Sequence, residues 1–107
     1  MRALISALLL CPAVAHAEFL SGNQLHDFCE RAPNLAHSYA AGVMDGIQTV
    51  EVMDTGQRVS LCPSSGVTVG QAGDVICRYL ESHPESRDLT AASIARKVFS
   101  EAWPCAD

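Results

Sequence analysis

Cys62 stands in the segment SLCPSSGVTVGQAG, residues 60–73, whose residue types could serve more than one kind of chemistry. Its glycines could hold a phosphate through backbone N–H groups, as glycine-rich loops do at the start of a helix. Phosphate loops of that kind follow a strand and include a lysine followed by serine or threonine. The segment has no such lysine and no strand is expected before it, so we predict neither a phosphate site nor a cofactor.

The thiol of Cys62 could also act as a nucleophile, which would require a base and a third group to orient that base. Beyond the first 17 residues, imidazoles are present at His26, His37 and His83, but none of them lies in a recognisable catalytic signature. A free thiol is not expected to persist in an oxidising compartment beside Cys29, Cys77 and Cys105, the other cysteines beyond residue 17. We therefore predict no catalytic residue and no enzymatic activity, and we expect these histidines at the surface.

Metal binding is a third use of such residues, and zinc sites usually include a close pair of the C-x-x-C type. The cysteines of this chain are far apart in the sequence, so no metal site is predicted. The carboxylates of Glu81 and Glu85 are four residues apart, but Pro84 interrupts the helix between them. That pair therefore indicates a solvated helix end.

Two further residues allow more than one interpretation. Asp45 is an acid within an otherwise small and apolar segment, AAGVMDG. It is interpreted as a buried carboxylate with hydrogen-bond partners, as an anchor for helix packing, or as a contact to a partner protein. Trp103 is expected either in the core or as a binding residue near the end of a helix.

The first 17 residues, MRALISALLLCPAVAHA, have an arginine, an apolar run and small residues at 15 and 17, as a cleavable secretory signal peptide does. A lipoprotein signal is disfavoured because Leu10, the residue before Cys11, is not small. Cleavage would leave one domain, residues 18–107, with six basic and twelve acidic side chains. This acidity disfavours nucleic acid and anionic lipid as partners and favours a basic protein surface.

The domain is expected to contain four helices and no sheet, because no segment alternates long enough to form strands. Ser21 and Gln24 form a capping box that starts a first helix, which Pro33 is expected to end. Asn34 is expected to cap a second helix. Its Gly42 and Gly46 are interpreted as a point where another helix approaches the backbone.

A long polar loop is expected over residues 54–66. Thr68 and Gln71 form a second capping box, so a third helix starts directly after SSG and ends at His83, before a proline. A fourth helix starts at Thr90 and ends near Trp103. The prediction is a single all-α domain, either a bundle or an orthogonal arrangement of helices.

Four cysteines remain after signal cleavage, which indicates two disulfides with three possible connectivities. If the third and fourth helices form an antiparallel hairpin, Cys62 and Cys105 lie at the same end of it. That pairing leaves Cys29 on the first helix for Cys77 on the third. In the chain-entropy account each bridge contributes at most roughly 4 kcal/mol.

Nearly the whole mature chain resembles the Rap/Tai-type immunity proteins, which protect bacteria against amidase toxins of type VI secretion. The matching pieces, in the family's order, are FLSGNQLHDFCE, YAAGVMDG, LCPSSGVTVGQAGDVICRYLESHPE and AASIARKVFSEAWPC. Many members have a cysteine just before the tyrosine of the second helix, where this chain has Ala36-His37-Ser38. The resemblance implies a helical fold, a homodimer, a periplasmic location and inhibition of a peptidoglycan amidase by blocking its active site.

The contacts to such a toxin are expected on polar, exposed loop residues. We predict them at Asp54, Gln57, Ser64 and Ser65. The alternative function is a periplasmic acid-stress or chaperone-like module without a toxin partner, in which protonation of the twelve acids exposes apolar surface.

Overall fold

The computed structural model describes residues 19–53 and 60–106, and this part of the chain is helical. Four α-helices and one 3₁₀ turn follow each other: α1 (Gly22–Arg31), α2 (Pro33–Met53), α3 (Val69–Ser82), η1 (Pro84–Ser86) and α4 (Ala91–Ala102). Its one β-type pairing is an isolated antiparallel bridge between Ser21 and Thr90. The predicted all-α fold is therefore confirmed. No helix in the described ranges is long and apolar enough to cross a bilayer.

Side-chain caps start three of the helices at the predicted residues. The Ser21 hydroxyl accepts from the N–H of Gln24, whose side chain in turn accepts from the N–H of Ser21. Thr68 and Gln71 form the same reciprocal pair at the start of α3. Thr90 caps α4 by accepting from the N–H of Ser93. These bonds satisfy N–H groups that the first turn of a helix cannot pair internally.

Pro33 does not end α1 in the way that the sequence suggested. Ala32 is the C-cap of α1, and Pro33 is the first residue of α2, so the two helices are separated by a single residue. Proline suits the first helical position because its missing N–H would have no helical partner there. Asn34 consequently lies inside α2 and is not its cap.

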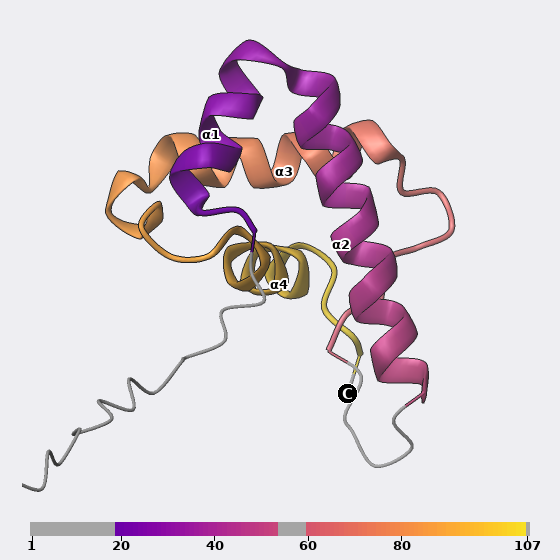
Figure 1. The fold of residues 1–107 in the computed structure, drawn as a ribbon. Coiled ribbons are helices and arrows are strands. Elements are labelled where there is room, and N and C mark those ends of the chain that lie inside the picture. Colours follow the sequence, from indigo (N-terminus) through magenta and orange to yellow (C-terminus); the bar gives the residue numbers. More distant parts are fainter. Residues whose placement is uncertain (1–18, 54–59, 107) are drawn as a thin grey trace, which may run out of the picture.

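The core lies where α3 packs against α1, α2 and α4 (Figure 1). Its largest fully buried side chains are Leu25, Ile76, Leu80 and Phe99. Alanines supply much of the remaining interior, and their small side chains let the helix axes come close together. The buried alanines are Ala36, Ala40, Ala72, Ala91 and Ala95.

The close approach between helices occurs at Gly73 and not at Gly42 or Gly46. Both glycines of α2 are exposed, and a Cβ placed on either one would meet nothing within 4 Å. A Cβ on Gly73 would instead collide with the ring of His37 on α2. Gly22 is similarly enclosed by the Ile94 side chain and the backbone of Arg87. The prediction that another helix approaches the backbone at Gly42 and Gly46 is therefore wrong, and the close approach occurs on α3 instead.

The start of α1 is joined to the connection that precedes α4. The N–H of Gly22 donates to the carbonyl of Leu89 at 2.8 Å, and the N–H of Ala91 donates to the carbonyl of Leu20 at 2.9 Å. These bonds flank the bridge between Ser21 and Thr90. Backbone hydrogen bonds thus tie residues 20–22 to residues 89–91.

Candidate partner-binding surface

Two disulfides hold the ends of the helices in the expected pairing. Cys29 on α1 is bonded to Cys77 on α3, with their Cα atoms 5.7 Å apart. Cys62, before α3, is bonded to Cys105, after α4, with a Cα separation of 4.9 Å. The N–H of Cys62 also donates to the carbonyl of Trp103 at 2.9 Å. Cys62 is therefore a structural residue, and its sulfur is not available as a nucleophile.

A cleft of about 370 Å³ opens beside the Cys62–Cys105 bridge. One wall is the segment that follows Cys62, the other is the exposed side of α3, and Trp103 contributes from the end of α4. Its lining residues are Ser64, Gly66, Val67, Gln71, Asp74, Val75, Arg78 and Trp103. The disulfide and the hydrogen bond to the Trp103 carbonyl both hold this wall at Cys62, and the capping box at Thr68 holds its other end.

The cleft combines an apolar wall with polar groups that face solvent. Trp103 packs on Phe99 of the core, with ring centroids 5.9 Å apart, and so lies both at the core and in the cleft. The Asp74 carboxylate lies within hydrogen-bonding distance of the His37 ring, with Oδ1 3.2 Å from Nε2. Within residues 19–53 and 60–106 the guanidinium of Arg78 has no hydrogen-bond or ion-pair partner. A rigid, partly apolar cleft with an unpaired cation is suited to contact with another protein.

Of the residues predicted to contact a partner, Ser64 lines this cleft and Ser65 is exposed beside it. Both belong to a turn that is closed by a bond of 3.1 Å from the N–H of Val67 to the carbonyl of Ser64. Asp54 and Gln57 lie outside the described residues. Trp103, for which a binding role was one of two expectations, also lines the cleft, and the sequence did not indicate the other lining residues.

Asp45 is an exposed residue of α2, which corrects two of its three interpretations. It is neither a buried carboxylate nor a packing anchor. Its backbone carbonyl accepts from the Thr49 hydroxyl one turn later at 2.8 Å. Contact with a partner is the interpretation that remains.

His26, His37 and His83 are partly buried, and each has a polar partner, whereas the sequence suggested surface positions. His37 packs on Gly73 and pairs with Asp74, while His83 bonds the carbonyl of Tyr79 at 3.0 Å and stacks on its ring. Each of these two rings thus packs against a neighbouring residue and also forms one polar contact. Tertiary packing brings His37 to Asp74, so sequence spacing could not indicate that pair, whereas His83 and Tyr79 are four residues apart at the end of α3.

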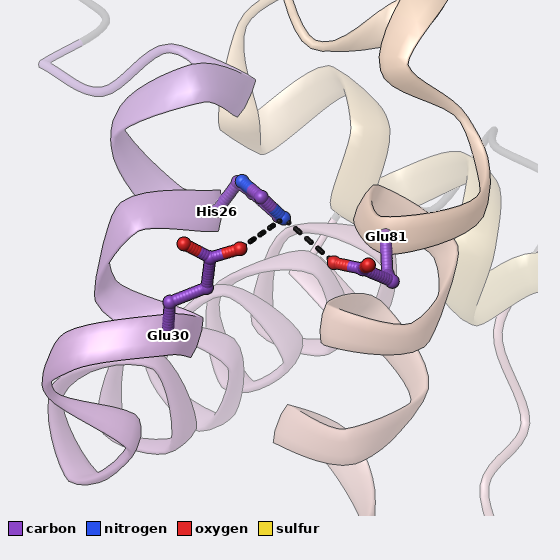
Figure 2. A group of neighbouring side chains, drawn as sticks. All are labelled: His26, Glu30 and Glu81. Atoms are coloured by element: carbon purple, nitrogen blue, oxygen red, sulfur yellow. Dashed lines mark hydrogen bonds and ion pairs between the residues drawn. The ribbon is translucent and has the colours of Figure 1, made fainter.

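His26 is the third paired histidine, and it lies between two carboxylates. Figure 2 shows His26 and Glu30 on α1 pointing toward Glu81, which belongs to α3. His26 Nε2 is 2.9 Å from Glu81 Oε2 and 3.3 Å from Glu30 Oε1. The hydrogen bond from His26 lowers the pKa of Glu81 below its ordinary value, and the charges of His26 and Arg87 act in the same direction against the effect of burial. Glu81 and Glu85 are both exposed, as expected of a solvated helix end, and Glu81 additionally pairs with His26.

Glu51 is a buried carboxylate that the sequence did not indicate. It is only 4% exposed, near the end of α2, and it accepts from both the N–H and the hydroxyl of Ser60. Arg96 of α4 lies 3.9 Å away. The Ser60 hydroxyl bond is the main reason why the pKa of Glu51 is lowered, and burial opposes it. This carboxylate ties the end of α2 to the segment that leads into Cys62.

Comparisons with known proteins support one family. The family model described as Rap1a immunity proteins matches residues 21–105, which span all four helices and both disulfides. Neither the curated proteins nor the solved structures gave a match.

Proposed function

The chain belongs to the Rap1a immunity protein family, and from this premise we propose that it protects its producer by blocking the active site of a peptidoglycan amidase toxin. Immunity against a toxin follows from the family. The amidase target and the blocking mode are our proposal, and they extend the resemblance of the sequence motifs described above.

The observation that supports a blocking mode is the rigid cleft at the Cys62–Cys105 bridge. A surface that enters an enzyme active site loses less conformational entropy on binding if it is already held in place. Here the disulfide, the Cys62–Trp103 hydrogen bond and the capping box at Thr68 hold the segment on both sides of Ser64 and Ser65. We propose that this segment, together with Asp54 and Gln57, contacts the toxin.

We further propose that the protein acts in the periplasm. Two disulfides are typical of chains that fold in an oxidising compartment, and the first 17 residues have the pattern of a cleavable signal. A periplasmic inhibitor would meet the amidase at its peptidoglycan substrate.

The test of this function is a direct inhibition assay. The mature chain is mixed at micromolar concentration with the amidase encoded beside its gene, and peptidoglycan hydrolysis and co-purification are measured. We expect loss of hydrolysis with the native chain and recovery of hydrolysis with Ser64→Arg or Ser65→Arg, because a long charged side chain would separate the two surfaces. Ser38→Arg, an exposed serine of α2 outside the cleft lining, is the matched control and should inhibit like the native chain. Absence of both inhibition and co-purification would rule out the amidase role.

A homodimer is the second part of the proposal. Val50, Val52 and Met53 at the end of α2 are 63%, 77% and 77% exposed, which is unusual for neighbouring large apolar side chains. We propose that a second copy covers them. Light scattering should give twice the chain mass for the native protein and the single chain mass for a Val50→Lys, Met53→Lys variant. A native monomer at all concentrations would contradict this part and leave the inhibition assay unaffected.

A further inference from the structure

In the group formed by His26, Glu30 and Glu81, two carboxylate oxygens lie close to a single imidazole nitrogen, Nε2 of His26. A neutral imidazole carries at most one proton on Nε2, and this proton can point to only one of the two carboxylates. Glu81 is the nearer acceptor, at 2.9 Å, and Glu30 lies 3.3 Å from the same nitrogen. Glu30 has no other partner among the described residues. One nitrogen thus faces two anionic groups.

From this geometry we propose that His26, Glu30 and Glu81 form a binding site for a divalent transition-metal ion, with Zn²⁺ as the ion that fits best. Their three potential ligand atoms all lie within 4.8 Å of one another (Figure 2). An imidazole and two carboxylates form a nitrogen and oxygen ligand set that zinc accepts. Magnesium and calcium prefer oxygen ligands alone, so the imidazole disfavours them.

The spacing of the ligand atoms supports this assignment. Tetrahedral zinc with bonds of about 2.0 to 2.2 Å places neighbouring ligand atoms roughly 3.3 to 3.6 Å apart. The separation between His26 and Glu30 is already 3.3 Å, and the one between His26 and Glu81 would widen slightly from 2.9 Å. Both glutamate side chains are more than half exposed and can adjust, whereas the His26 side chain is only 15% exposed and fixes the centre.

The surrounding fold brings the ligands together in advance. The Cys29–Cys77 bridge joins α1 to α3 about one helical turn from both His26 and Glu81. Glu81 is also the second-last residue of α3, where the partial negative charge of the helix end favours a cation. Arg87 already donates to the carbonyls of Leu80 and Glu81 there, which offsets part of this effect. The metal would therefore bind mainly through its three direct ligands and would retain an open position toward solvent.

The experiment is a titration of the untagged mature protein, freed of metal by a chelator, with ZnCl₂ in a calorimeter near pH 7.5. We expect one ion per chain. His26→Ala, Glu30→Gln and Glu81→Gln should each weaken binding by about tenfold or more, the equivalent of about 1.4 kcal/mol. Co²⁺ in place of Zn²⁺ should give visible absorption bands with the native chain and lose them with these variants.

Two control variants separate a built site from general attraction between Zn²⁺ and an acidic protein. Glu85→Gln removes one nearby exposed carboxylate, and His83→Gln removes a histidine whose bonded partner is a carbonyl. Both should bind Zn²⁺ like the native chain. The proposal is overturned if the native chain takes up no Zn²⁺, or if Glu85→Gln and Glu81→Gln weaken binding equally. The circular dichroism of each variant reports whether it is folded, and the isosteric glutamine variants retain the shape of the site.

Discussion

The ring of His37 on α2 lies directly against the backbone of Gly73 on α3. No room exists there for a β-carbon, so Gly73→Ala should force the two helices apart. We expect a loss of about 1 to 3 kcal/mol in the free energy of unfolding, measured by urea denaturation. Gly42→Ala is the matched control, because a methyl group there meets nothing within 4 Å on an exposed helix face. It should stabilise the protein by about 0.5 to 1 kcal/mol. If the two variants changed the free energy of unfolding equally, α2 and α3 would not approach each other closely at Gly73.

Removal of either disulfide should destabilise the domain, because each bridge restricts the unfolded chain. The bridges close loops of similar length, with sequence separations of 48 and 43 residues. We expect each double serine variant, at Cys29 with Cys77 or at Cys62 with Cys105, to lose about 2 to 4 kcal/mol in the free energy of unfolding. Denaturation under non-reducing conditions measures this loss. Alkylation of thiols in the native exported protein would contradict the pairing itself.

Stability should depend on the ionisation of Glu51 in mildly acidic solution. Its pKa in the folded protein lies below the ordinary value of 4.5, chiefly because of the Ser60 hydroxyl bond. A depressed pKa contributes stability that is fully present above the unfolded value and is lost as pH falls through the folded value. The native chain should therefore exceed Glu51→Gln in stability at pH 7, and the difference should shrink below pH 4.5. Denaturation of both proteins from pH 7 to pH 3 measures this.

The control for that prediction is Glu85→Gln, which changes an exposed carboxylate of η1. Its stability should follow that of the native chain throughout the same range. A constant difference between the native chain and Glu51→Gln at every pH would show that the two side chains differ in packing and not in charge. Binding of a hydrophobic dye near pH 3 would additionally favour the acid-stress alternative.

Arg78 should matter for binding to the toxin and not for folding. Its guanidinium has no partner in the described part of the chain and lines the cleft beside Trp103. If that cleft contacts the amidase, Arg78→Glu should weaken inhibition by about tenfold or more, because a repulsive or unpaired charge would enter the interface. The melting temperature should remain unchanged. Arg31→Glu, on α1 and paired with Asp27, is the control and should leave inhibition as it is. An unaltered inhibition constant for Arg78→Glu would place the interface elsewhere.

Features that depend on neighbouring residues could be predicted from the sequence. The capping boxes at Ser21 and Thr68 are local patterns, and they placed the starts of α1 and α3 correctly. The end of α3 at His83 followed from the proline after it. The cysteine pairing was also predicted correctly. The antiparallel hairpin assumed for that pairing was wrong, because Figure 1 shows α3 lying across the view and α4 nearly end-on, so the two helices cross. The resemblance to the family was likewise drawn from local motifs, and the family model confirms it over residues 21–105.

Features that arise between helices could not be predicted in this way. Gly73 and Gly42 are equally plausible contact points in the sequence, and only the packing against His37 distinguishes them. Glu51 lies in a short segment, VEVMD, that resembles an exposed helix end, yet Ser60 and Arg96 surround its carboxylate. His26 and Glu81 are more than fifty positions apart in the sequence, so no helical or strand periodicity could indicate that they meet.

The bridge between Ser21 and Thr90 has a consequence for the order of assembly. A polypeptide is made and exported from its amino end, so α1 emerges first and then waits without its neighbours. The backbone groups of Gly22 and Leu20 find their partners only when Leu89 and Ala91 have followed. Closure of the domain is therefore a late event: a chain cut off before Arg87 would still have the Cys29–Cys77 link between α1 and α3, but the start of α1 would lack these backbone partners.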